Sequence, residues 1–96
     1  MSFMNQDTPE QITEHGASVV ITHRVSEASR AQYEQWLKVI GSLCKASKGL
    51  LDHHIIRPIP GLSDTYSIFM RYDTEHHLKQ WMESEDRKHL LAEVQG

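Results

Sequence analysis

The apolar positions along the chain divide it into segments with the patterns of strands and helices. Residues 18–25 (SVVITHRV) are rich in β-branched side chains and are bounded by Gly16 and Ser26, which predicts a strand. In residues 27–47 the apolar side chains recur every three or four positions, which predicts an amphipathic helix. Gly49 suits the left-handed conformation that often ends a helix. Residues 50–57 and 65–72 again predict strands, and the prolines between them indicate a hairpin-type turn.

Two shorter helices are expected in the last quarter of the chain. Asp73, Thr74 and Glu75 supply a capping side chain and negative charge where a helix would begin. Ser84 can likewise cap a helix, and the two acidic residues that follow it supply negative charge at its start. It therefore predicts the start of a last helix, which runs to the end of the sequence.

The predicted order of elements is β-α-β-β-α-α, which indicates an α+β fold. The first helix joins two strands that would be parallel, and a right-handed crossover places all helices on one face of the sheet. This arrangement is a ferredoxin-like split β-α-β in which the last strand is absent or very short. We assign residues 17–96 to this domain and residues 1–16 to a flexible acidic arm. Either the sheet stays short, or the arm or another subunit completes it.

One face of the predicted sheet has no helix to cover it. By strand alternation this face carries Val20, Thr22 and Arg24, and on a second strand Phe69 and Arg71. A chain of 96 residues has a marginal core of its own. We therefore expect a homodimer that forms sheet to sheet through this half-apolar face.

Charge is unevenly distributed along the chain. There are 10 Lys and Arg against 13 Asp and Glu, a formal net charge of −3, and the whole acidic excess precedes Arg24, the first basic residue. The remainder is balanced and has no broad basic face, so we expect no nucleic-acid binding. No run of apolar residues is long enough for a membrane span, and the first residues do not resemble a secretory signal. The single cysteine, Cys44, cannot form an internal disulfide, which favours a cytoplasmic location.

Residues 18–94 resemble a known family. The segments VVITHRV, YEQWL, GLLDHHIIRP, TYSIFMRYD and HLKQWMESEDRKHLL are similar to the antibiotic biosynthesis monooxygenase (ABM) domain of the dimeric α/β-barrel superfamily. The resemblance implies a homodimer with a pocket between the sheet and the helices. Some members carry out oxygen chemistry on aromatic substrates there without metal or flavin. We therefore expect a cofactor-independent monooxygenase that acts on a small aromatic or quinol-like molecule and needs no cofactor.

His23 is the candidate catalytic residue. Its imidazole lies on the apolar face of its strand, which should point at the helices, and it matches a functional position of the family. A histidine there can act as a general base that deprotonates a phenol, so that the phenolate or carbanion meets O2. The alternative is a buried histidine that is satisfied by a structural hydrogen bond.

Aromatic residues supply most of the candidate substrate-binding side chains. Trp36 and Trp81 lie on apolar helical stripes, where they could stack on a flat ring. Tyr66 and Tyr72 could donate their hydroxyls to a developing oxyanion, and Arg57 could hold a substrate carboxylate. Core packing, or for Arg57 a structural ion pair, is the alternative for each of them.

Other functions stay open beside the monooxygenase. A non-catalytic homodimer that binds a small ligand or a protein is compatible with the same fold. Haem binding or degradation is less favoured, because the position of the histidine ligand in that branch of the superfamily is Leu91 here, and His89 faces away. The histidines show no metal-ligand spacing, so no metal site is expected. Arg87 follows Glu83 by one helical turn, which predicts an ordinary surface pair.

Overall fold

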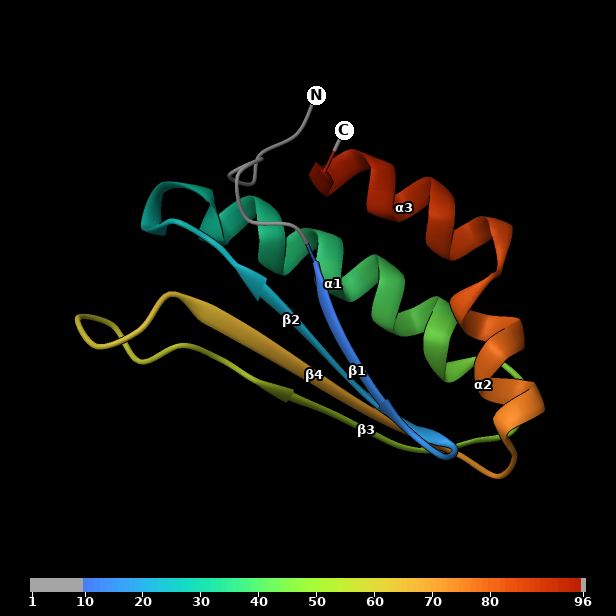
Figure 1. Cartoon of the computed structure of the whole chain (residues 1–96). Helices are drawn as coiled ribbons and strands as arrows, with labels where there is room; N and C mark the ends of the chain where they lie inside the picture. Colours follow the sequence, from blue (N-terminus) through green and yellow to red (C-terminus); the bar gives the residue numbers. More distant parts are fainter. Residues whose placement is uncertain (1–9, 96) are drawn as a thin grey trace.

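The computed structural model describes residues 10–95, which form a four-stranded antiparallel sheet and three α-helices (Figure 1). This is an α+β arrangement compatible with a ferredoxin-like fold. The strands are β1 (Gln11–His15), β2 (Ser18–Arg24), β3 (Leu50–Ile56) and β4 (Thr65–Tyr72). The helices are α1 (Arg30–Lys45), α2 (Glu75–Met82) and α3 (Glu85–Gln95), and a short 3-10 helix, η1 (Glu27–Ser29), precedes α1.

The sheet has the strand order β1-β2-β4-β3, and each neighbouring pair is antiparallel. Strands β2 and β3 both pair with β4, so they run parallel to each other, and α1 makes the crossover between them. The predicted strands and helices are confirmed to within a few residues. Among the predicted elements, the largest difference is that residues 27–29 form η1 instead of the first turn of the long helix.

Strand β1 corrects the assignment of residues 1–16 to a flexible arm. Residues 11–15 pair with β2 along their whole length, with Ile12 opposite Ile21. They occupy the sheet position beside β2 that the last strand of a split β-α-β fold would take, and no strand follows α3 in the described part of the chain. Gly16, with φ +61°, provides the tight turn into β2. The pattern missed β1 because all five of its residues are exposed. Residues 1–9 of the expected arm lie outside the described residues.

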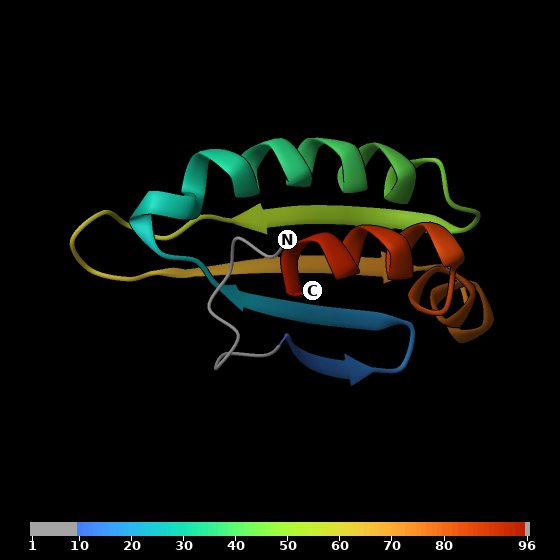
Figure 2. The same ribbon diagram turned by 90° about the horizontal axis from the view of Figure 1, so that it is seen from above.

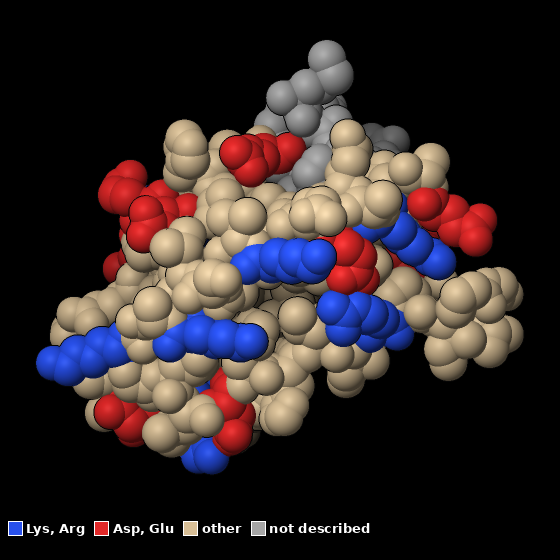
Figure 3. Space-filling model, turned by 180° about the vertical axis from the view of Figure 1, so that it is seen from behind, with Lys and Arg blue, Asp and Glu red and all other residues tan. Residues whose placement is uncertain are grey.

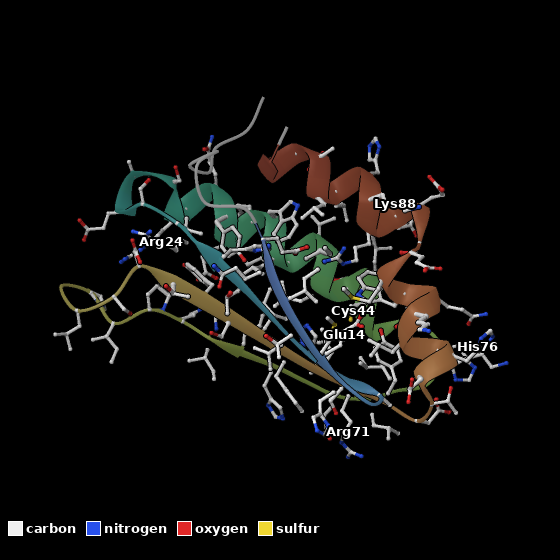
Figure 4. All side chains as sticks on the ribbon, in the orientation of Figure 1. Glu14, Arg24, Cys44, Arg71, His76 and Lys88 are labelled. Atoms are coloured by element: carbon white, nitrogen blue, oxygen red, sulfur yellow. The ribbon has the colours of Figure 1, made fainter. Side chains whose placement is uncertain are left out.

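The helices lie on one side of the sheet (Figure 1), and α1 runs along the β3 side, where it packs against β3 and α3 (Figure 2). The core is formed by the inward-facing side chains of β2 and β4 together with the apolar stripe of α1. The opposite face is open, as predicted. It carries the exposed side chain of Val20 and the half-buried Phe69, and Arg71 projects from it away from the helices (Figure 4).

Gly49 links α1 to β3 in the left-handed conformation that the sequence predicted, with φ +88°. The amide of Asp73 donates to the Gly49 carbonyl at 2.8 Å, so the turn lies directly against the start of α2. A Cβ at position 49 would overlap Asp73 Oδ1 and stand 2.9 Å from His77 Cβ. The position therefore requires glycine for both its backbone conformation and its packing.

We expect Gly49→Ala to lower the free energy of unfolding by about 2–4 kcal/mol, because backbone strain and the overlap with the start of α2 add together. Gly16→Ala is the matched control. It also has a positive φ, but nothing lies within 4 Å of the added Cβ. It should cost only about 1 kcal/mol. Urea unfolding followed by circular dichroism measures both values, and equal losses would contradict the importance of the packing at Gly49.

Candidate functional site

A small cavity lies between the sheet and the helices, around the candidate base. It holds about 30 Å³, which is room for about one or two water molecules. The side chains of His23, Trp36 and Trp81 line it, together with Glu10 and Arg87. Most of the remaining lining is apolar, so the charged groups act in surroundings that screen them weakly. The cavity is much smaller than the ~300–1,000 Å³ of typical ligand sites.

The carboxylate of Glu10 joins three distant parts of the chain at this cavity. Its Oε2 lies 2.8 Å from His23 Nε2 on β2, and its Oε1 accepts a hydrogen bond of 2.7 Å from Arg87 Nη2 on α3. The side chains of Glu10 and Arg87 are each only 7% exposed. Both carboxylate oxygens therefore have a partner, as a buried charge requires.

His23 has side-chain partners at both ring nitrogens. Nδ1 lies 2.5 Å from the Tyr33 hydroxyl, and Nε2 faces Glu10. Because a carboxylate only accepts hydrogen bonds, Nε2 carries a proton, and in the neutral ring Nδ1 accepts from Tyr33. Burial raises the pKa of Tyr33, and the charge of Glu10 raises it further, so this side chain stays a phenol able to donate. The result is an ordered chain of hydrogen bonds from Tyr33 through His23 to Glu10.

The partners of Glu10 keep it ionised. Burial by itself works to raise the pKa of Glu10, but the hydrogen bond from His23 and the charge and hydrogen bond of Arg87 outweigh this effect. The net pKa of the carboxyl is lowered. At neutral pH the cavity wall therefore carries a buried carboxylate paired with a guanidinium.

The two tryptophans expected to bind substrate both line the cavity. The indole of Trp36 donates to the Leu90 carbonyl at 2.7 Å, which fixes its ring between α1 and α3. The same ring meets His23 edge to face, with the ring centroids 5.7 Å apart. Trp81 reaches the cavity from α2.

The other three predicted binding residues lie elsewhere. Tyr66 donates its hydroxyl to Glu34 at 2.9 Å. The hydroxyl of Tyr72 is hydrogen-bonded to Ser47 at 2.7 Å, and burial raises its pKa. Neither tyrosine is among the residues that line the cavity. Arg57 lies outside it and forms a two-pronged ion pair with Glu34, at 2.8 and 3.0 Å.

Sequence reasoning missed three residues of the site: Glu10, Tyr33 and Arg87. The predicted surface pair of Arg87 with Glu83 is wrong, because Arg87 is only 6% exposed and its guanidinium is directed at Glu10. The two partners are 77 positions apart, so no local spacing links them. The one available signal was the acidic excess of the N-terminal segment. Because this segment contains no Lys or Arg, any such partner of its carboxylates has to come from another part of the chain.

Other site types are not seen in the described residues. Within residues 10–95, no three His, Cys, Asp or Glu side chains gather in a way that could hold a metal ion. None of the described helices has the length and apolar content needed to cross a bilayer. His89 is exposed on α3, and Leu91, two positions further along, is half-buried.

Comparisons with models of known protein families, with curated proteins and with solved structures found no match to this chain. The resemblance to the ABM domain therefore rests on the sequence segments alone. The chemistry of the site has to be argued from its own residues.

We expect Glu10→Gln to lower the free energy of unfolding at neutral pH by about 3–5 kcal/mol, because it leaves Arg87 buried without a counter-charge. The folded-state pKa of Glu10 lies below its ordinary value of 4.5. Its contribution is therefore fully present above that pH and is lost as the pH falls through the lower folded-state pKa. The difference in free energy of unfolding between the wild type and Glu10→Gln should therefore become smaller at acidic pH.

Urea unfolding at pH 7 and at pH 3 measures this difference. Glu14→Gln is the control, since Glu14 is exposed on β1, and it should change stability by less than about 0.5 kcal/mol. A Glu10→Gln loss as small as that of the control, or one that is constant across the pH range, would contradict the buried ion pair.

Proposed function

We propose that the protein is a cytoplasmic, homodimeric, cofactor-independent monooxygenase of the ABM type, a dimeric α/β barrel that oxidises a small aromatic or quinol-like molecule. The observation that supports this function most is the Glu10–His23 pair, which is buried at the wall of a cavity between two tryptophans. A carboxylate that holds one ring nitrogen fixes the tautomer and the orientation of the imidazole. Flat apolar walls suit an aromatic ring.

In the proposed reaction His23 acts as the base. Its Nδ1 takes a proton from a phenol hydroxyl of the substrate, while Glu10 holds the Nε2 proton. The resulting phenolate has carbanion character at a ring carbon, and this carbon is oxidised by O2: a C–O bond forms and gives a hydroperoxide after protonation. Loss of water then breaks the O–O bond and leaves a quinone carbonyl. The balance is one phenol O–H, one ring C–H and one O2 to two C=O and one H2O, so such a substrate needs no cofactor.

The hydroxyl of Tyr33 marks the position of the substrate's acidic group in this proposal. It lies 2.5 Å from Nδ1, the nitrogen that has to receive the proton. When the substrate binds, the hydrogen bond between His23 Nδ1 and the Tyr33 hydroxyl is therefore replaced by one between Nδ1 and the substrate. The cavity also has to widen from its present 30 Å³ to admit an aromatic ring.

A second candidate function is a non-catalytic homodimer that binds a small ligand or a protein. Two observations favour it: the cavity has water-sized volume, and both nitrogens of His23 already have partners. In this interpretation the buried network serves stability, and any ligand binds outside the cavity.

The proposed homodimer forms through the open face of the sheet. Val20 on β2 and Phe69 on β4 lie directly opposite each other on this face, and the ring of His54 stacks on Phe69 at a centroid distance of 6.1 Å. This apolar strip is flanked by charged side chains such as Arg24 and Arg71, which matches the polar rim of many interfaces.

Oxygen uptake by metal-free protein in a screen of di- and trihydroxyaromatic compounds tests the enzyme directly. We expect turnover of at least one compound, and His23→Gln should lower kcat/KM by at least about 100-fold, since general-base catalysis contributes that much. His89→Gln, a change at an exposed histidine of α3, should leave the rate unchanged. Circular dichroism confirms that both variants are folded. Equal activity of His23→Gln and wild type would refute the base, and binding without uptake would favour the second candidate.

Sedimentation equilibrium tests the dimer. We expect the wild type to be dimeric at micromolar concentration, and Val20→Lys to weaken the dimer at least about tenfold, because it buries a charge at the centre of the interface. Val39→Lys is the matched control, since Val39 is exposed on α1, away from the sheet. A wild type that is monomeric, or two variants with the same association constant, would contradict the open face as the interface.

A further inference from the structure

A larger hollow lies on the outside of the domain, between α1 and the edge strand β3. Its volume is about 470 Å³, within the range of small-molecule sites. From behind, blue Lys and Arg side chains surround a depression on this face (Figure 3). We call it the α1–β3 groove. It is separate from the cavity beside His23, although Leu37, Gly41 and His53 line both.

The α1–β3 groove has an excess of positive charge. Lys38 and Lys45 line it from α1, seven positions apart and therefore on one face of the helix. The third cation, Arg57, is already neutralised by Glu34 through two hydrogen bonds. No salt bridge to either lysine occurs in the described part of the chain. The charge of Lys38 does act on Glu34, whose pKa it helps to lower, but neither ammonium group is held in an ion pair among the described residues, so both can contact a bound anion.

Gly41 lies between the two lysines, in the middle of α1. Glycine in a helix interior stabilises the helix less than alanine does. The surrounding protein does not require it, because a Cβ there would meet only His53 Cε1, at 4.0 Å, an ordinary contact. The missing side chain leaves the backbone of α1 bare where the groove meets the cavity.

The opposite wall at this point is the imidazole of His53. Burial lowers the pKa of His53, and the charges of Lys45 and His54 lower it further, so the ring is neutral at pH 7. A neutral, half-buried ring facing a bare helix backbone is a surface for a flat apolar group. The cationic part of the groove lies beside it.

We infer that the α1–β3 groove binds a small aromatic carboxylate. The carboxylate pairs with Lys38 and Lys45, and the ring lies at the inner end, against Gly41 and His53 and next to the cavity. This narrows the substrate class of the proposed function to aromatic acids and rests on that function for turnover. Binding itself does not depend on turnover and can be measured alone.

The test compares 2,5-dihydroxybenzoate with uncharged 1,4-dihydroxybenzene and with acetate, by NMR titration of the 15N-labelled full chain. We expect the aromatic acid to bind at least tenfold more tightly than either of the other two, with shifts along α1 and β3 and at the Trp36 indole. Lys38→Gln/Lys45→Gln should weaken its binding about tenfold, as the loss of two ion pairs predicts. Lys79→Gln/Lys88→Gln is the control with the same change in net charge. Both of these lysines are exposed on other helices, and Lys88 points outward in Figure 4.

Gly41→Ala tests the inner end of the groove. The added methyl group should weaken binding of the aromatic acid about tenfold while it raises the midpoint of thermal unfolding, because alanine favours the helix. An affinity unchanged by Gly41→Ala, equal binding of the uncharged compound or of acetate, or equal losses in the two lysine variants would overturn the inference. If the aromatic acid binds as expected but no oxygen is taken up, only the proposed function is contradicted. If oxygen is taken up but binding does not follow this pattern, only the assignment of the groove as the binding site is contradicted.

Discussion

The buried carboxylate of Glu10 is the interaction on which the rest of the structure depends. It connects the start of β1, the end of β2 and α3 through one hydrogen bond to His23 and one to Arg87. Strand β1 has five exposed residues and contributes little apolar burial of its own. Its place in the sheet therefore depends on backbone pairing with β2 and on this polar anchor rather than on a hydrophobic face. Removing water from these charges is costly, and the fold tolerates the cost because each oxygen of the carboxylate has a partner.

The same anchor determines the chemistry of the candidate site. With Glu10 at Nε2, His23 presents Nδ1 as its acceptor, and Tyr33 occupies it. Stability and acid-base function are thus combined in one network. The volume of the cavity beside it is sufficient for only about one or two water molecules, whereas the α1–β3 groove has the volume of a ligand site. His53 and Gly41 line both spaces, so a ligand in the groove would lie next to the buried network.

Local sequence patterns predicted most of the elements. The alternation in residues 18–24 and 65–72 reflects strands with one buried face, and the spacing of Tyr33, Trp36 and Leu37 reflects a helix with one buried stripe. The left-handed turn at Gly49 was readable because few other residues adopt it. The open sheet face followed from the same alternation. For the candidate site, His23 and the two tryptophans were found because buried aromatic and imidazole side chains stand out on apolar faces.

The sequence by itself therefore determined the type and order of every strand and α-helix except β1, because these depend on neighbours a few positions apart. Only the tertiary structure decided that residues 11–15 form the fourth strand, that Arg87 is buried, and that Tyr66 and Tyr72 lie outside the cavity lining. It also decided the small size of that cavity and the position of the two lysines over β3. Each of these depends on which distant segments meet. Glu10 and Arg87 are separated by 77 positions and leave no local pattern in the sequence. In the folded protein they form a buried ion pair, because either charge buried alone would have no opposite charge to compensate it.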